Sequence, residues 1–446
     1  MYSVAFETLG CKLNFSETSS IRRTFSENGF RITGFDDKAD IYVINTCSVT
    51  ADANSSCRKT VRRALRRNPA AFIAVIGCYA QLEPEEIAEI DGVDVVIGVK
   101  DKFRILDIFS TFSKQDDTLI YNSDVNEAVD FHNAFSSDDR TRAFLKIQDG
   151  CSYKCSFCTI PRARGKSRSP DIEIVMRSAE KLVGEGYREI VITGVNAGDF
   201  GAGRDENFYM LLQSLDNIHG LRRIRVSSVE PNLLHDSIIH LAAGSDKIQP
   251  HFHIPLQSGS DDMLGLMRRR YKTRLYRDRV ELIRQLLPEA CIGVDVIAGH
   301  PGETDKLFQE SYEFLKNIDV SYLHVFTYSE RPGTDALDLK PVVPVSVRKK
   351  RNRKLRQLSV RKRRRFNSRF TGTKRAVLFE GENKNGLIHG WTDNYIRVAL
   401  PYRKRFENRI LPVQLTRQTD DGLILGTIGR EELDRELAIE TLVDHG

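Results

Sequence analysis

The stretch GCSYKCSFC, residues 150–158, decides how the central part of the chain is interpreted. It places Cys151, Cys155 and Cys158, the loop cysteines, in a C-x3-C-x2-C pattern just after the β-rich run 143–148. Iron–sulfur clusters are held by cysteine thiolates, usually four of them. Three close thiolates without an evident fourth therefore favour a cubic cluster that keeps one iron open. Structural zinc is the rival, but it needs four ligands and typically has paired C-x2-C spacing.

Strand-like and helical segments alternate on either side of this motif. The candidate strands are 143–148, 189–193, 223–227, 251–254, 292–298 and 322–326. Six such units are too few to close an eight-fold barrel. The sequence therefore predicts an α/β domain over 140–345 that is an open (β/α)6 partial barrel.

The N-terminal part, 1–115, repeats the strand–helix order on a smaller scale. Its β-rich runs are 2–6, 41–45, 72–77 and 93–97, and this order predicts a parallel sheet covered by helices. Cys11, Cys47 and Cys78, the sheet-edge cysteines, each follow one of the first three runs. Carboxyl ends of parallel strands share one edge of the sheet. We expect a second three-cysteine cluster there, although each cysteine alone would more often be a small hydrophobe.

Two further cysteines lie outside both groups. Cys57 falls in a predicted helix ten residues after Cys47, and incidental helix packing is favoured over a role as a spare ligand. Cys291 opens a predicted barrel strand and is assigned to the core.

The last hundred residues begin with a concentrated positive charge. Residues 348–365 hold 12 Lys and Arg and no acid, and without them 55 basic and 61 acidic residues remain. A basic stripe of this kind is typical of polyanion binding, while a solvated helix or linker is the alternative. We assign 346–369 to a basic linker or helix. Short strands at 375–379, 390–398, 411–416 and 423–426 predict an all-β module over 370–446.

The overall composition limits the classes of protein to which this chain could belong. The 446 residues are 40% hydrophobic and 29% charged, which is typical of a multidomain globular protein and not of a disordered one. No apolar run reaches the ~18 residues that cross a bilayer, and the first residues show no export signal. Eight cysteines are too few for a disulfide scaffold in a chain of this length. We expect a cytoplasmic protein with no membrane contact, and a polar linker at 116–139.

These motifs resemble a known family. With Phe157 before its third cysteine, the central motif resembles the radical S-adenosylmethionine (SAM) superfamily. LGCKLN at 9–14, NTCSVT at 45–50 and GCYAQ at 77–81 look like the cluster-binding domain of methylthiotransferases. GWTDNYIRV at 390–398 resembles the RNA-binding TRAM domain. In this order they cover essentially the whole chain, which is similar to radical SAM methylthiotransferases.

The resemblance implies two 4Fe-4S clusters, one on the sheet-edge cysteines and one on the loop cysteines, the latter binding SAM. The positions that would contact SAM are the following residues near strand ends: Phe157, Gly194, Asn196, Ser227, Glu230, Gln257, Ser258, Ile297 and Gly299. One departure concerns His300, in AGHPGET, where family members usually carry Phe. We expect it to change the polarity of the pocket and to leave activity in place.

The resemblance also implies a reaction. Electron transfer through the loop cluster would break SAM to give a 5′-deoxyadenosyl radical. The sheet-edge cluster would hold the sulfur, which a first SAM methylates before a second SAM supplies the radical. IPRARGKSRSP at 160–170, SSVEP at 227–231 and YSERPGTDA at 328–336 look most like the group acting on N6-threonylcarbamoyladenosine at tRNA position 37. The alternatives are isopentenyladenosine in tRNA, a ribosomal-protein aspartate, or a non-catalytic iron–sulfur RNA-binding protein.

Expected partners follow from this chemistry. They are the anticodon loop of tRNA and an electron donor such as flavodoxin or ferredoxin, with the sulfur source open and the enzyme a monomer. Trp391 and Tyr395 are candidates for base stacking, although a Trp in a small barrel is more often core. Arg162, Arg164 and Arg168 are candidates for phosphate or SAM contacts, with solvated surface as the alternative.

Overall fold

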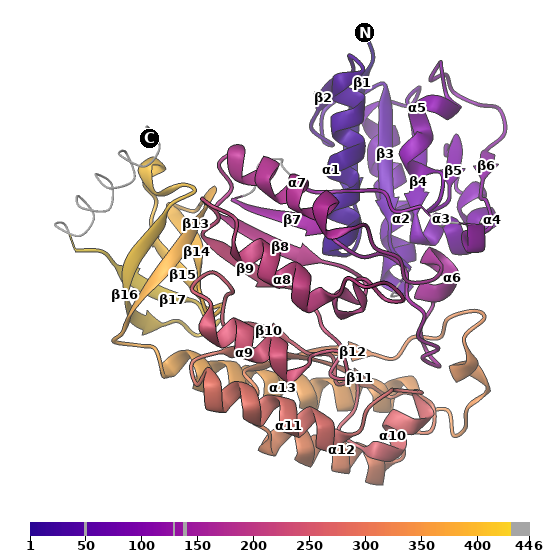
Figure 1. Ribbon diagram of the computed structural model, residues 1–446. Helices are drawn as coiled ribbons and strands as arrows, with labels where there is room; N and C mark the ends of the chain where they lie inside the picture. The colour runs from indigo at the N-terminus through magenta and orange to yellow at the C-terminus, as the bar shows by residue number, and fades with distance from the viewer. Residues whose placement is uncertain (49–50, 128–129, 137–140, 430–446) are drawn as a thin grey trace.

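The computed structural model describes residues 1–48, 51–127, 130–136 and 141–429, with side chains at all of these except 51–54 and 382. Residues 49–50 of the NTCSVT motif and 430–446 of the expected C-terminal module lie outside the described residues. Figure 1 shows three successive regions, with the N-terminal domain at the upper right, the partial barrel below it and the C-terminal module at the left. Among the described helices, none is both long and apolar enough to cross a membrane.

The N-terminal domain is a six-stranded parallel sheet in the order β2-β1-β3-β4-β5-β6. Its strands are β1 Ser3–Thr8, β2 Arg31–Thr33, β3 Ile41–Thr46, β4 Phe72–Gly77, β5 Val95–Ile97 and β6 Leu119–Tyr121. Its helices are α1 Lys12–Glu27, α2 Ala51–Arg67, α3 Cys78–Leu82, α4 Pro84–Ala88 and α5 Ile105–Ile108. The expected parallel sheet is confirmed, and β6 extends it into the segment that the sequence assigned to a linker.

Central strands β3 and β4 are buried along their whole length. Their near-continuous apolar sequences, IYVINT and FIAVIG, are typical of parallel strands covered on both faces. One face packs on α1 through Ile21 and Phe25. The other packs on α2 through Cys57 and Val61, so Cys57 occupies the core, as expected.

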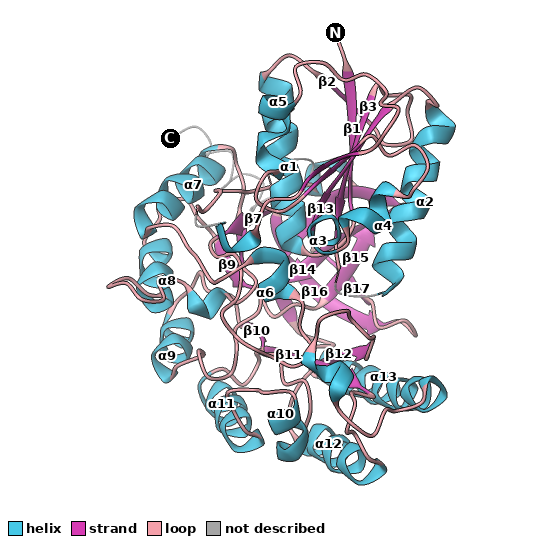
Figure 2. Ribbon diagram, turned by 90° about the vertical axis from the view of Figure 1, so that its right-hand side faces the viewer, coloured by secondary structure: helices cyan, strands magenta, loops and turns pink. Residues whose placement is uncertain are grey.

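The central domain contains two parallel three-stranded sheets, β7-β8-β9 and β10-β11-β12, joined by bridges including Ser228 to His253. Its strands are β7 Arg142–Lys146, β8 Glu189–Thr193, β9 Arg223–Val226, β10 His251–His253, β11 Cys291–Ala298 and β12 Tyr322–Thr327. Its helices are α6 Ile160–Arg164, α7 Ile172–Gly184, α8 Phe208–Asp216, α9 Asp236–Gly244, α10 Asp261–Leu266, α11 Thr273–Leu286, α12 Asp305–Asn317 and α13 Val345–Ser368. Figure 2 shows α7–α13 on an arc outside the strands, which confirms the open six-stranded partial barrel.

The basic run forms most of α13, and this helix is part of the barrel wall. Leu355 and Leu358 belong to the same core as β11 and β12. Arg348 and Arg351 are buried, and Arg351 pairs with Glu303 at 2.7 Å. The first turns of the run therefore serve the fold, and only its outward-facing residues stay exposed.

The C-terminal module is a closed five-stranded barrel in the order β13-β14-β15-β17-β16. Its strands are β13 Lys374–Lys384, β14 Leu387–Thr392, β15 Arg397–Pro401, β16 Ile410–Gln418 and β17 Ile424–Thr427. The strand expected at 390–398 is interrupted by a turn in which Tyr395 has φ +63°. Arg223 and Arg225, at the start of β9, donate to main-chain oxygens of Trp391 and Thr392. The module therefore covers the amino ends of the barrel strands, opposite their carboxyl ends.

Candidate active site

The sheet-edge cysteines lie at adjoining strand ends. Strand register pairs Thr8 of β1 with Asn45 of β3, and Thr46 of β3 with Gly77 of β4. Cys47 and Cys78 thus come one residue after paired positions, and Cys11 leaves the neighbouring strand as the N-cap of α1. The topology brings these three distant cysteines to one edge, as the sequence predicts.

Close packing at this edge requires a glycine. Gly10 has φ +134°, and a Cβ built on it would lie 2.6 Å from Cβ and 3.2 Å from Sγ of Cys47. Any side chain here would displace Cys47, and the positive φ independently favours glycine. Gly10 therefore allows the turn before Cys11 to lie directly against Cys47.

Cys78 meets a fully buried cation from the central domain. Nε of Arg164, on α6, donates to Sγ of Cys78 at 3.2 Å. Ala163 of the same helix packs against Cys78 in a small apolar cluster. Since α6 begins two residues after Cys158, the segment carrying the loop cysteines also contacts the sheet-edge site.

A buried charge network surrounds this contact. Glu17 of α1 is fully buried and pairs with Lys102 at 2.5 Å, Lys146 at 3.0 Å and Arg164 at 2.9 Å. Asp149 pairs with Lys146 at 2.8 Å and Arg164 at 2.9 Å. Burial acts to raise the pKa of Glu17, but the surrounding cations dominate and hold that pKa well below its usual range. Both carboxylates are therefore ionised, and they join the N-terminal and central domains.

The loop cysteines lie in a different environment. Nη1 of Arg269 donates to Sγ of Cys155 at 3.1 Å, while its Nη2 pairs with Glu230. Burial raises the pKa of Cys151 to about 11 and that of Cys158 to about 12. Without a metal, both would therefore be neutral thiols at pH 7 and poor nucleophiles, because the thiolate is the reactive form.

The chemistry of both sets of cysteines, the loop cysteines and the sheet-edge cysteines, suits an iron–sulfur cluster. All six are free cysteines. Within the described part of the chain, no three Cys, His, Asp or Glu side chains are grouped to hold one metal ion. A cubic cluster presents a separate iron to each thiolate, so its ligands need not meet at one point. The buried cation beside Cys78 supplies the positive charge that an anionic cluster ligand requires.

Two expected SAM contacts have unused polar groups. Both side-chain polar atoms of Asn196 are buried without a hydrogen-bond partner in the described structure, and so is Oγ of Ser227. Leaving a buried donor or acceptor unpaired costs about 1–3 kcal/mol. Asn196 follows β8 and Ser227 follows β9, at the carboxyl edge of the partial barrel. These orphaned atoms fit a polar ligand such as SAM.

The other expected contacts have varied surroundings. Glu230 binds Arg269, and Gly194 lies beside Gln148. Gln257 has φ +70°, a strained conformation of the kind that clusters at functional sites. Ser258 accepts a hydrogen bond from the main chain of residue 260, and Ile297 is half-buried on β11. A Cβ on Gly299 would lie 2.3 Å from Arg348, so that glycine serves packing on α13.

His300 lies against the cysteine loop and is fully buried. Its ring is 5.9 Å from that of Phe157, edge to face. Nδ1 lies 2.7 Å from the carbonyl oxygen of Pro301, which can only accept, so Nε2 accepts from Oγ of Ser156 at 3.3 Å. Burial lowers the pKa of His300 to about 4, and the residue is neutral at pH 7. It therefore adds a hydrogen bond, and no charge, beside the cysteine loop.

A row of polar groups on β10–β12 was missed by sequence reasoning. Nε2 of His253 lies 3.0 Å from Oδ1 of Asp295, and Nδ1 contacts Ser228. His324, paired with Asp295 in register, is exposed and meets the His253 ring edge at 5.4 Å. The Lys12 ammonium, next to Cys11, is within electrostatic range of Asp295. Asp295, a charged residue within the otherwise apolar sequence of β11, was the sequence signal for this face.

The three arginines and two aromatic residues considered for phosphate contact or base stacking all have protein partners. Arg164 is buried in the network above, Arg168 pairs with Asp149 at 3.0 Å, and Arg162 donates to a carbonyl oxygen of residue 332. Tyr395 stacks on Trp391 at 4.4 Å and, on β10, on His251 at 4.0 Å. Both rings therefore belong to the junction between the C-terminal barrel and the partial barrel, which removes the faces of Tyr395 from base stacking.

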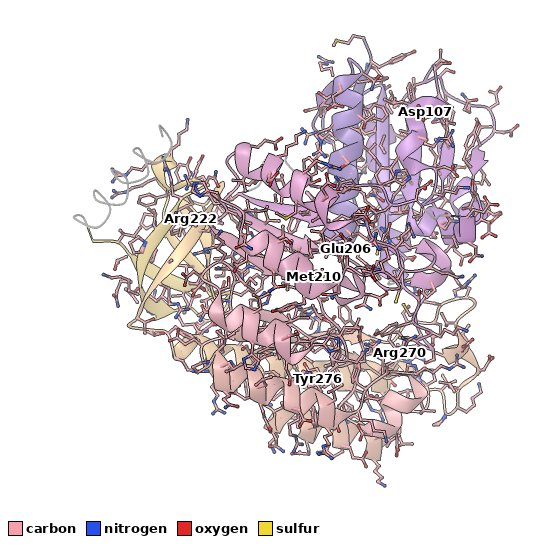
Figure 3. All side chains as sticks on the ribbon, in the orientation of Figure 1. Asp107, Glu206, Met210, Arg222, Arg270 and Tyr276 are labelled. Atoms are coloured by element: carbon pink, nitrogen blue, oxygen red, sulfur yellow. The ribbon has the colours of Figure 1, made fainter. Side chains whose placement is uncertain are left out.

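The cysteine loop is also held by residues of later barrel segments, one of which is labelled in Figure 3. Arg270, labelled there, lies over the ring of Tyr153 at 3.9 Å. Tyr153 is part of the cysteine loop, and Nδ2 of Asn232 donates to its hydroxyl at 2.8 Å. The loop is thus held from two later segments of the barrel.

Known proteins share both the sequence and the fold. Residues 3–98 match the "Uncharacterized protein family UPF0004", and residues 145–315 match the "Radical SAM superfamily". The chain is 40% identical to "Threonylcarbamoyladenosine tRNA methylthiotransferase MtaB" of Bacillus subtilis, covering 93% of this chain and 94% of the relative. It is 39% identical to the protein of that name from Aquifex aeolicus, with 89% and 96% covered.

A more distant relative carries another name. "tRNA-2-methylthio-N(6)-dimethylallyladenosine synthase" of Methylacidiphilum infernorum is 30% identical, with 94% of this chain and 93% of the relative covered. Among solved structures, the radical SAM methyltransferase TsrM of Kitasatospora setae superposes with a TM-score of 0.57 at 14% identity, with 75% of each chain covered. That likeness concerns the fold alone. The domain matches and the identities over most of the chain show that this protein belongs to the radical SAM methylthiotransferase family.

Proposed function

We propose that this enzyme adds a methylthio group to C2 of N6-threonylcarbamoyladenosine at position 37 of tRNA, using two 4Fe-4S clusters and two molecules of SAM. Membership of the radical SAM family implies SAM and one 4Fe-4S cluster. The second cluster is supported by the placement of the sheet-edge cysteines at one edge of the sheet. Cys78 there contacts α6, the helix that follows the loop cysteines in the sequence. Relatives that bear the threonylcarbamoyladenosine name support the substrate.

Each group of residues has a distinct task in this proposal. When bound, the two clusters supply the electron for reductive cleavage of SAM and the sulfur atom for transfer. Cys151, Cys155 and Cys158 hold the cluster that leaves one iron for SAM. Asn196 and Ser227 donate to or accept from the polar groups of SAM, which satisfies their orphaned atoms. The surrounding residues exclude water, because a primary radical needs a dry site to limit side reactions.

The polar face of β10–β12 supports the choice of substrate. A threonylcarbamoyl group carries a carboxylate and a hydroxyl, whereas an isopentenyl group is apolar. His324 is exposed on this face beside the His253–Asp295 pair, and Lys12 approaches from the N-terminal domain. An apolar isopentenyl group packed against these groups would remove water from them and offer no hydrogen bond in return, which is costly. Charged and hydrogen-bonding groups at this position favour the threonylcarbamoyl substrate.

Mass spectrometry of tRNA nucleosides tests the function directly. Deletion of the gene should remove 2-methylthio-N6-threonylcarbamoyladenosine and leave the unmodified precursor in its place. Re-expression of the full chain should restore the product, while re-expression of a Cys47→Ala variant should not. The proposed substrate would be refuted if the deletion left the threonylcarbamoyladenosine products unchanged. Loss of the methylthiolated isopentenyladenosine, or of methylthiolation in a ribosomal protein, would then identify the true substrate.

A non-catalytic role is excluded or established by a second assay. Reduced, anaerobically reconstituted protein mixed with SAM should release 5′-deoxyadenosine. A Cys155→Ala variant, which lacks one ligand of the SAM-binding cluster, is the matched control and should release none. Equal background from both proteins would show that the clusters serve only structure.

A further inference from the structure

The guanidinium of Arg164 uses all of its hydrogen-bond donors on the interior of the protein. Its Nε donates to Sγ of Cys78 at 3.2 Å. Nη1 donates to Glu17 and Asp149, both at 2.9 Å, and Nη2 donates to Asn14 at 2.6 Å and Glu17 at 3.0 Å. An arginine has five N–H donors in a fixed planar fork, so each of them has a defined acceptor here. A lysine ammonium could not reproduce this arrangement.

The charges around Arg164 do not balance without a further anion. The fully buried cations of the network are Arg164, Lys102 and Lys146, and its buried carboxylates are Glu17 and Asp149. Among these fully buried groups the cations outnumber the carboxylates by one, and Arg168 adds a partly buried cation at Asp149. Burying an uncompensated charge is strongly unfavourable. The remaining contact of Arg164 is the sulfur of Cys78. A thiolate there, as in a metal-bound cysteine, would offset part of this excess.

Arg164 also connects the loop cysteines with the sheet-edge cysteines. Arg164 ends α6, six residues after Cys158. The main-chain N–H of Cys151 donates to the carbonyl oxygen of Gly165 at 3.0 Å. One short segment therefore runs from a loop cysteine to Cys78 and returns to another loop cysteine. The position of α6 fixes the distance between the two proposed cluster sites.

We propose that Arg164 is a positioning residue for the sheet-edge cluster: it holds the Cys78 thiolate in place, balances its charge and ties it to the segment that carries the loop cysteines. This inference rests on the proposed function, because it takes Cys78 as a cluster ligand. Residues that donate to a metal ligand from outside the coordination sphere orient it, and losing one lowers metal affinity about 10–100-fold. A hydrogen bond to the sulfur also tunes the reduction potential of an iron–sulfur cluster.

The experiment isolates the sheet-edge site. Full-length protein with Cys151, Cys155 and Cys158 all replaced by Ala leaves the sheet-edge cysteines as the proposed cluster site. Arg164→Met and Arg164→Lys are then introduced separately, and circular dichroism confirms that each variant is folded. After anaerobic reconstitution, iron and sulfide per chain, resistance of the iron to a chelator, the EPR spectrum of the reduced cluster and its midpoint potential are measured.

Arg164→Met should lose iron to the chelator about 10–100-fold more readily than the parent. Arg164→Lys keeps the positive charge and loses the planar guanidinium with its five donors. This variant should therefore bind the cluster with an altered EPR spectrum and a shifted midpoint potential. Arg177→Lys is the control, because Arg177 is exposed on α7, pairs with Glu173 of the same helix and does not contact Cys78 in the described structure. It should match the parent in every readout.

Two outcomes would overturn the inference in different ways. If both Arg164 variants load iron as the parent does, with the same spectrum and potential, Arg164 serves only the fold and the proposed function stands. If the parent with the intact sheet-edge cysteines binds no cluster, Cys78 is not a ligand, and the two-cluster function fails together with the role of Arg164.

Discussion

The two sets of cysteines in this enzyme, the loop cysteines and the sheet-edge cysteines, are brought together in opposite ways. The loop cysteines lie within eight residues of one another and owe their proximity to the chain itself. The sheet-edge cysteines are separated by 36 and 31 positions and meet only because β1, β3 and β4 are neighbours in register. Consequently the first site depends on a local motif, whereas the second depends on the packing of a whole domain.

The polar groups around the two sets of cysteines also differ. At the carboxyl ends of β8 and β9, Asn196 and Ser227 have polar atoms without hydrogen-bond partners in the described structure, a property of a site that binds a separate molecule. Next to the sheet-edge cysteines, Arg164 has every donor paired, and Glu17 is completely enclosed. We infer that the first site is built to admit a ligand and the second to hold one in place.

Replacing one cysteine from each group should separate the two roles most sharply. Cys155→Ala should abolish both the release of 5′-deoxyadenosine from SAM and the methylthiolation of tRNA. Cys47→Ala should abolish methylthiolation and leave SAM cleavage largely intact, because it affects only the sheet-edge site. Both products are quantified by mass spectrometry after reconstitution. Equal loss of SAM cleavage in the two variants would contradict the division of roles.

Glu17→Gln tests whether buried charge holds the sheet-edge region together. Removing this carboxylate takes from Lys102 its carboxylate partner and leaves Lys146 and Arg164 with Asp149 alone, and breaking a buried pair typically costs about 3–5 kcal/mol. The midpoint of guanidinium denaturation should fall accordingly. Glu7→Gln is the control, because the Glu7–Arg63 pair is about one-third exposed, and such pairs contribute about 0–1 kcal/mol. Equal effects of the two substitutions would show that the network adds no special stability.

His300 should make stability near the cysteine loop depend on pH. Its pKa falls from 6.5 to about 4 on folding because the ring is buried. Between those values the unfolded chain binds a proton that the folded chain excludes, so the free energy of unfolding falls as the pH is lowered. At pH 5 the loss should be about 2 kcal/mol. His300→Phe should remove it, as measured by denaturation at pH 7 and pH 5, and an unchanged difference between these pH values would refute the assignment.

The smallest expected effect concerns the orphaned amide at the SAM site. Asn196→Ala should weaken SAM binding about tenfold, the equivalent of one hydrogen bond of about 1.4 kcal/mol. Equilibrium binding of SAM to the reconstituted protein measures this, with Asn217→Ala, at the exposed C-cap of α8, as the control. Unaltered affinity in Asn196→Ala would place SAM elsewhere on the carboxyl edge.

Much of this architecture was predictable, because it is encoded in local patterns. Buried runs such as 72–77 identify the central parallel strands, and a strand before each sheet-edge cysteine places all three at one edge. The three-residue edge strands β2 and β6 escaped prediction, since segments this short have no recognisable periodicity. Tyr395 interrupts the strand expected at 390–398 through a positive φ that its residue type does not announce.

The chemistry of individual charges was less predictable than the fold. Arg164 lies in the basic motif 160–170, where phosphate contact or solvent exposure was the natural expectation, yet it is buried. Its acceptor Glu17 is distant in sequence and becomes a partner only through domain packing, whereas Asp149 lies in the same domain, just before the cysteine loop. The same holds for Arg348 and Arg351 in the basic run, which the barrel wall encloses. Charge composition identifies a partner class, whereas tertiary contacts decide which charges remain available.

Counting iron tests the central claim that six thiolates form two separate cluster sites. Anaerobically reconstituted protein should bind about eight iron atoms per chain, and each triple variant, with either the loop or the sheet-edge cysteines replaced by Ala, should bind about four. A parent that binds only four, with no change when Cys11, Cys47 and Cys78 are replaced, would contradict the account.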